Sequence, residues 1–175
     1  EGFISDSGVR RALAALGKFR ETIDRFGISA VHAFGTSAFR NARNGPALAT
    51  EIESLTGITV RIISGEEEAD FIFEGVKAAV CMDREVNLVM DIGAGSVEFI
   101  IGNSEKIFWK QSFEIGGQRL LEKFQKHDPI LADEVRALDS YAITTLRQLL
   151  EALEKYKPVI LTGSSGTFDT LSDIH

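Results

Sequence analysis

The sequence of 175 residues contains a single cysteine, Cys81, so the chain cannot form an internal disulfide, and a reducing cytoplasm is the expected location. Cys81 has no histidine or cysteine nearby, which favours a buried structural thiol over a nucleophile. No apolar run approaches the roughly 20 residues that cross a bilayer. The first residues lack the basic and apolar regions of a secretory signal. We therefore expect no membrane association.

Positive charge is also scarce, because 19 Lys and Arg residues stand against 26 Asp and Glu residues, for a net charge of −7. This balance argues against nucleic acid as a partner, and an anionic substrate would need a local basic site. The three histidines are scattered without metal-ligand spacing, and no Ser/His/Asp set is evident. The chemistry of the chain must therefore be sought in other residue types.

Hydrophobic periodicity predicts an α/β protein, because helical and extended patterns alternate in the first half and a parallel sheet is the usual result. The second half reads as an antiparallel run followed by helix, strand and helix. We place the domain boundary near 84–87. The predicted helices are 9–26, 46–56, one from Ser64 to about 80, one from 120, a single long helix 132–155 and a last one after 167. The predicted strands are 30–34, 58–63, 87–92, 97–102, 107–113 and a buried strand 159–161.

The most informative segment is Asp91-Ile-Gly93-Ala94-Gly95-Ser96-Val-Glu98, a glycine-rich turn between two apolar runs. Such a turn can present backbone N–H groups to an anion, because glycine allows close approach and positive φ. The flanking acids Asp91 and Glu98 can hold a hard cation such as Mg²⁺. No Gly-Lys-Ser/Thr follows, and Glu98 occupies the place of the third Rossmann glycine, so neither nucleotide-binding motif fits. A tight hairpin corner remains the structural alternative.

A second segment, residues 35–44, follows a predicted strand and contains Thr36, Ser37 and Arg40. Thr36 or Ser37 can cap a helix whose first turn binds an anion, and Arg40 can reach a phosphate with its bidentate fork. The alternative is a solvated arginine on an ordinary capped helix.

A third segment, Ser64-Gly-Glu66-Glu67-Glu68-Ala69, opens a predicted helix. Ser64 and Glu67 have the spacing of a capping box, and acids suit the N-terminus of a helix. Glu68 can instead act as a general base that deprotonates a water attacking phosphorus. Spacing alone favours the capping interpretation.

The last segment, Gly163-Ser-Ser165-Gly166-Thr167, follows the strand at 159–161. Its backbone can contact a phosphate or nucleotide. The alternative is a tight strand-to-helix turn with Thr167 as the N-cap residue.

These segments, together with Ile115-Gly-Gly117 and Arg119-Leu120, resemble in order and spacing the exopolyphosphatase / guanosine pentaphosphate phosphohydrolase (Ppx/GppA) family. The resemblance spans nearly the whole chain. It implies an α/β, ribonuclease H-like fold of the actin-like ATPase (sugar kinase–Hsp70–actin) superfold with two similar domains. Residues 1–86 would be the C-terminal part of domain I, and residues 87–175 most of domain II.

The resemblance also implies an activity: Mg²⁺-dependent removal of the terminal phosphate from polyphosphate or from guanosine pentaphosphate, an alarmone of the stringent response. Carried over by motif, Glu68 becomes the catalytic base in place of the capping interpretation. Asp91 and Glu98 become the metal-associated acids. The phosphate-binding residues would be Arg40, Gly93, Ala94, Gly95, Ser96, Ser165, Gly166 and Thr167.

Two departures from the family pattern affect these expectations. Ala94 replaces the usual middle glycine of the second phosphate loop, so either the loop geometry differs or this position is unstrained. The family's first motif, of the Asp-x-Gly-Ser-Asn type, is missing, and the chain stops short of the usual last helices. We therefore expect an incomplete N-terminal domain, and inactivity of this piece alone is one outcome. A homodimer is one possible assembly, since an exposed sheet edge can pair with another chain.

Two rival functions share this phosphate-loop logic. One is a non-catalytic module that binds polyphosphate or the guanosine penta- and tetraphosphate alarmones. The other is an actin-like ATPase or kinase, against which the segment 64–69 argues.

Overall fold

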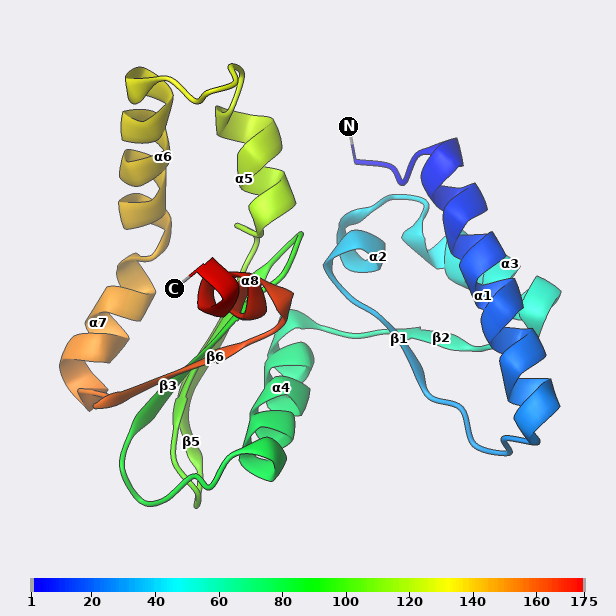
Figure 1. The fold of residues 1–175 in the computed structure, drawn as a ribbon, viewed down its shortest axis with the longest axis horizontal. Helices are drawn as coiled ribbons and strands as arrows, with labels where there is room; N and C mark the ends of the chain where they lie inside the picture. Colours follow the sequence, from blue (N-terminus) through cyan, green and yellow to red (C-terminus); the bar gives the residue numbers. More distant parts are fainter. Residues whose placement is uncertain (1, 175) are drawn as a thin grey trace. The chain divides into compact units, whose positions relative to one another are not determined.

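The computed structural model describes residues 2–174 (Figure 1). The chain divides into two compact units, one ending at Ser64 and the other beginning at Gly65. The sequence places the boundary later, near 84–87. The difference arises because helix α4 (Gly65–Ala79) packs on the sheet of the second unit and therefore groups with it. The assignment of residues 1–86 and 87–175 to two actin-like domains stays a prediction.

The first unit is built on two helices whose ends follow from the sequence. Helix α1 (Asp6–Phe26) begins at Ser5, whose Oγ accepts a hydrogen bond from the Gly8 N–H, and ends at Gly27 in the left-handed conformation. Helix α3 (Gly45–Thr56) ends at Gly57 in the same conformation. Between them lie β1 (Ala33–Gly35) and α2 (Ser37–Asn41). Strand β2 (Val60–Ile62) follows α3 and pairs in parallel with β1. The buried core consists of Ile23, Leu48, Ile52 and Ile58.

Gly17 lies inside α1 with open space around it, because a Cβ built there meets no heavy atom within 4 Å. A glycine in a helix interior costs stability relative to alanine. We expect Gly17→Ala to raise the free energy of unfolding by about 0.5–1 kcal/mol, measured as an upward shift of the urea midpoint. Gly45→Ala is the contrasting variant, because its Cβ would lie 2.0 Å from the Phe39 carbonyl oxygen, and it should shift the midpoint downwards.

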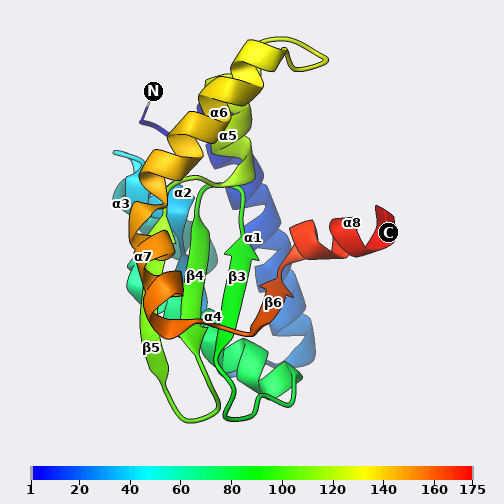
Figure 2. The same ribbon diagram turned by 90° about the vertical axis from the view of Figure 1, so that its left-hand side faces the viewer.

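The second unit is a four-stranded sheet in the order β5-β4-β3-β6 (Figure 2). Strands β3 (Asn87–Ile92), β4 (Val97–Gly102) and β5 (Ile107–Phe113) form the predicted antiparallel run with the predicted bounds. Strand β6 (Ile160–Ser164) pairs in parallel with β3. Helix α4 covers one face, with Phe73 against Val89 and Ile100. Helix α7 (Arg147–Tyr156) packs on the other face.

Three expectations about the second unit are wrong. The helix predicted over 132–155 is two helices, α6 (Ala132–Thr145) and α7, because the backbone at Leu146 (φ −87°, ψ 13°) leaves the helical region and redirects the chain. Residues 159–161 are not a buried strand: Val159 and Leu161 are 70% and 60% exposed, because β6 is the edge of the described sheet. Cys81 is exposed rather than buried.

The remaining helices are α5 (Gly117–Phe124) and α8 (Gly166–Ile174), which follow β5 and β6. Among residues 2–174, no helix combines the length and the apolar character that crossing a membrane requires.

Glu134, in the first turn of α6, stabilises the loop that joins α5 to α6. Its carboxylate accepts hydrogen bonds from the backbone N–H groups of Leu131 (2.9 Å) and Lys126 (3.0 Å), and it lies 2.9 Å from His127 Nδ1. The Leu131 N–H, His127 and the Lys126 N–H hold the pKa of Glu134 below its ordinary value. The charged form therefore stabilises the folded state.

This direction predicts how stability depends on pH. A depressed folded-state pKa gives a contribution that is present above the unfolded-state value and is lost as the pH falls through the folded-state value. We expect the Tm difference between the wild type and Glu134→Gln to be largest near neutrality and to shrink between about pH 5 and about pH 3. A thermal unfolding series checks this, and a difference that persists unchanged at the acid end would contradict it.

Candidate functional site

Strand register brings the two predicted metal-binding acids together. Asp91 on β3 lies directly opposite Glu98 on β4. The row continues on both sides, because Ser112 on β5 lies opposite Glu98 and Ser164 on β6 lies beside Asp91. Directly paired residues share a face of the sheet. This polar row, Ser112–Glu98–Asp91–Ser164, therefore lies on the face that α4 covers.

Glu98 is a buried acid, only 2% exposed, in the middle of that row. The Ser112 Oγ donates a hydrogen bond to its Oε1 at 2.7 Å. Burial raises the pKa of the Glu98 carboxyl above its ordinary value, and the charges of Glu68 and Asp91 act in the same direction. The hydroxyls of Ser112 and Ser96 oppose this shift.

Glu68, the predicted base, lies half-buried in the first turn of α4. Its charge acts on the Glu98 carboxyl, and so does that of Asp91. The three acids that the sequence singles out, from α4, β3 and β4, thus form one acidic cluster within the second unit. The capping role considered for its neighbours Ser64 and Glu67 is compatible with the start of α4 at Gly65.

The loop 93–96 joins the two acid-bearing strands, and its carbonyl groups are held by the start of α5. The backbone N–H groups of residues 116, 117 and 118 donate to the carbonyls of Gly95, Gly93 and Ala94 at 3.0–3.1 Å. The carbonyl of one residue and the N–H of the next point in opposite directions across a planar trans peptide. The N–H groups of Ala94, Gly95 and Ser96 therefore point away from α5, where an anion can meet them.

Ala94 is unstrained. Among the described residues, positive φ occurs at Gly2, Gly27, Gly57, Lys157 and Ser165, and not in the loop 93–96. The positive φ expected from the glycines of this loop is thus not used, and alanine fits in place of the family's middle glycine. Glycine is instead needed at position 116, where the start of α5 contacts this loop. A Cβ at Gly116 would lie 2.4 Å from the Ala94 carbonyl carbon and the Gly95 nitrogen.

Arg119 also holds this loop, although the sequence interpretation assigned it no role. Its Nε donates to the Gly95 carbonyl at 3.0 Å, and its Nη2 lies 2.8 Å from a Glu114 carboxylate oxygen. Its place in the resemblance, within Arg119-Leu120, was the signal that could have identified it.

The β6–α8 loop holds the end of β3 through side chains. The Ser165 Oγ and the Thr167 Oγ1 both donate to the Ile92 carbonyl, at 3.1 and 3.0 Å. These hydroxyls therefore fix the residue that precedes the loop 93–96. The predicted phosphate contacts of Ser165, Gly166 and Thr167 stay predictions.

Arg40 belongs to the first unit, in α2. Its Nη1 donates to the Ile63 carbonyl at 3.0 Å, which ties α2 to the end of β2. Thr36 is the N-cap residue of α2 by position, but its side chain makes no capping hydrogen bond. The phosphate contact of Arg40 stays a prediction.

The acidic cluster suits a hard cation by its chemistry. Asp91 and Glu98 supply only oxygen ligands, and the buried charge of Glu98 lies beside two like charges that a cation would offset. Residues 2–174 contain no group of three or more His, Cys, Asp or Glu side chains arranged to hold a metal. Mg²⁺ typically takes one or two protein carboxylates and completes its shell with water and phosphate oxygens. Two carboxylates therefore fit that mode of binding.

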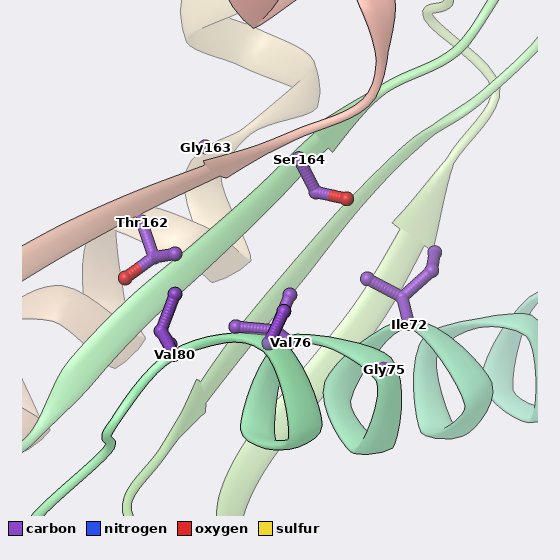
Figure 3. Close-up of a pocket in the computed structure, with 8 residues that line it drawn as sticks. Ile72, Gly75, Val76, Val80, Thr162, Gly163 and Ser164 are labelled. Atoms are coloured by element: carbon purple, nitrogen blue, oxygen red, sulfur yellow. The ribbon is translucent and has the colours of Figure 1, made fainter.

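A groove of about 290 Å³ lies between α4 and β6 on the same face of the sheet (Figure 3). One wall is apolar, with Ile72 and Val76 on α4 and Val80 directly after that helix. Its β6 wall carries Thr162 and Ser164, whose side chains are on the α4 face. Because Ser164 pairs with Asp91, one end of this groove adjoins the polar row.

Comparison with known proteins finds matches that extend over the whole chain. The profile of the Ppx/GppA phosphatase family matches residues 1–175. A bifunctional 3-dehydroquinate synthase/phosphatase from Fusobacterium nucleatum is 33% identical over 177 residues, which cover 96% of this chain and 26% of that protein. A guanosine-5'-triphosphate,3'-diphosphate pyrophosphatase from Photobacterium profundum is 29% identical, over 98% of this chain and 34% of that protein.

Solved structures agree with this result. An exopolyphosphatase from Cytophaga hutchinsonii has a TM-score of 0.96 and 46% identity, covering 99% of this chain and 56% of that one. The Aquifex aeolicus PPX-GPPA enzyme has a TM-score of 0.76 and 25% identity at the same coverage. The predicted actin-like superfold is therefore confirmed. The chain spans about a third or less of these curated relatives and about half of these solved chains.

Proposed function

Because this chain belongs to the Ppx/GppA phosphatase family, we propose that it is part of a hydrolase that removes the terminal phosphate of inorganic polyphosphate or guanosine pentaphosphate. Relatives named exopolyphosphatase and guanosine-5'-triphosphate,3'-diphosphate pyrophosphatase support this substrate class. The observation that carries the proposal is the acidic cluster of Glu68, Asp91 and Glu98 beside the loop 93–96.

In this proposal the loop 93–96 binds the terminal phosphate. The start of α5 holds three of its carbonyls, so the N–H groups of residues 94–96 are fixed before substrate arrives. Fixed N–H donors stabilise negative charge on phosphate oxygens without reorganising. Arg40 and the backbone of residues 165–167 are the further phosphate contacts that we propose.

Glu68 acts as the base in this proposal. It accepts a proton from the attacking water and orients that water in line with the bond to the leaving phosphate. Asp91 and Glu98 would hold Mg²⁺, which when bound would neutralise charge on the phosphate oxygens.

The test is phosphate release from long-chain polyphosphate and from guanosine pentaphosphate, with Mg²⁺ and with EDTA. Both this chain and the full-length protein that contains it should be assayed, because the chain spans only part of its relatives. Release by the full-length protein that EDTA abolishes supports the proposal. Binding of either polyanion without release would favour the non-catalytic module, and phosphate transfer from ATP to an acceptor would favour the kinase alternative. The location in the cytoplasm and a homodimer stay predictions.

A further inference from the structure

Strand β5 carries none of the predicted site residues, but two of its side chains hold the elements that do. Lys110 and Ser112 are two positions apart, so both lie on the sheet face that α4 covers. Ser112 contacts Glu98, and Lys110 contacts the first turn of α4.

Ser112 fixes the carboxylate of Glu98. It is the direct cross-strand partner of Glu98, and its Oγ donates to Oε1 at 2.7 Å. Because Glu98 is only 2% exposed, water cannot readily replace this hydrogen bond. A hydrogen bond to a buried carboxylate orients that group as well as stabilising its charge.

Lys110 fixes the turn that carries Glu68. Its Nζ lies 2.5 Å from Asp70 Oδ1 and donates to the Glu66 carbonyl at 3.1 Å. These two residues flank Glu68 in sequence. The Lys110 side chain is only 24% exposed, so the ion pair is partly shielded from water. A cation at the N-terminal end of a helix is disfavoured by the helix dipole, so this arrangement depends on the acids that surround it.

We propose that β5 is the positioning strand of the site: Ser112 sets the orientation of Glu98, and Lys110 sets the place of Glu68 through the first turn of α4. This inference rests on the proposed function, because it takes Glu68 as the base and Glu98 as a metal-binding acid. It assigns no chemistry to Lys110 or Ser112 themselves. Both act through an acid on a neighbouring element.

The Ser112 arm is tested by metal binding, which does not depend on turnover. Mn²⁺, a paramagnetic substitute for Mg²⁺, is titrated into the full-length protein and followed by electron paramagnetic resonance. We expect Ser112→Ala to weaken Mn²⁺ binding by about tenfold, the usual scale for removing a hydrogen bond to a metal ligand. Ser112→Thr, which keeps the hydroxyl, should restore most of it. Equal Mn²⁺ affinity in Ser112→Ala and the wild type would overturn this arm.

The Lys110 arm is tested by amide hydrogen exchange and by steady-state kinetics of the full-length protein. We expect Lys110→Met to speed exchange in residues 66–73 about threefold or more and to lower kcat with little change in KM. Lys110→Arg, which keeps the positive charge, should restore most of kcat. Unchanged exchange in Lys110→Met would overturn this arm.

Lys77→Met is the matched control, because Lys77 lies on α4 itself and pairs with an acid of that helix, Glu74, at 3.3 Å, beyond the first turn. It should leave exchange in residues 66–73 and kcat unchanged. If it had the same effect as Lys110→Met, general weakening of α4 would explain both, and the proposal would fail. If the wild-type protein released no phosphate, the proposed function would be overturned but the positioning roles of Ser112 and Lys110 would not. Mn²⁺ affinity and hydrogen exchange test those roles without turnover.

Discussion

Glu68→Gln is expected to lower the turnover of phosphate release by about 10²–10⁴-fold, the usual scale for removing a general base. Glutamine keeps the size of the side chain but cannot accept the proton of the attacking water. The fold should not suffer, because the substitution removes one of the charges that act unfavourably on Glu98. Phosphate release and thermal unfolding of the full-length variant, measured side by side, test both halves of this expectation.

The control for this prediction is Glu66→Gln, which makes the same chemical change in the same turn of α4. The Glu66 side chain is exposed, and its contact with Lys110 is made by the backbone carbonyl, so turnover should stay near the wild-type level. Turnover of Glu68→Gln within a few-fold of the wild type would remove Glu68 from the role of base.

Gly116→Ala is expected to lower phosphate release about 10²-fold and to reduce the free energy of unfolding by about 1–3 kcal/mol. The added Cβ would lie 2.4 Å from two backbone atoms of the loop 93–96, and backbone cannot rotate away as a side chain can. The loop must therefore move, and its N–H groups with it. The backbone at Gly116 (φ −60°, ψ 159°) suits any residue, so the effect is steric alone. Activity and urea unfolding measure it.

The adjacent glycine provides an unusually close comparison. A Cβ at Gly117 meets no heavy atom within 4 Å, so Gly117→Ala should keep both activity and stability. If the two alanine variants behaved alike, the close approach of α5 to the loop 93–96 would not matter for phosphate release.

Much of the fold could be predicted from local pattern. The runs 87–92, 97–102 and 107–113 alternate with turn-forming segments, and their bounds agree with the structure. The prediction of a single helix over 132–155 was wrong because the apolar periodicity continues past Leu146, where neither glycine nor proline marks the break. The prediction that the strand at 159–161 is buried was wrong because an apolar run does not show whether a strand lies inside a sheet or at its edge.

The site residues that belong to a sequence motif could be predicted. Those that reach the site only through strand register could not. Asp91 and Glu98 flank a recognisable loop, and register then placed them opposite each other. Ser112 has no motif around it. A hairpin around residues 103–106 would have placed it near Glu98, but the irregularity at Ile101/Gly102 decides the pairing, and that depends on three-dimensional structure. Lys110 could not be found either, because its contact depends on how α4 packs.

The polar row Ser112–Glu98–Asp91–Ser164 also bears on how this sheet folds correctly. A slip of β4 by one residue would turn Glu98 to the opposite face, against the apolar Phe113, Ile115 and Leu149 and away from the Ser112 hydroxyl. Burying an unpaired charge there would be far more costly than losing a few apolar contacts. The acids proposed to act on phosphate thus also penalise misregistered strands during folding. Variants that replace both acids with apolar residues should therefore populate more than one strand pairing.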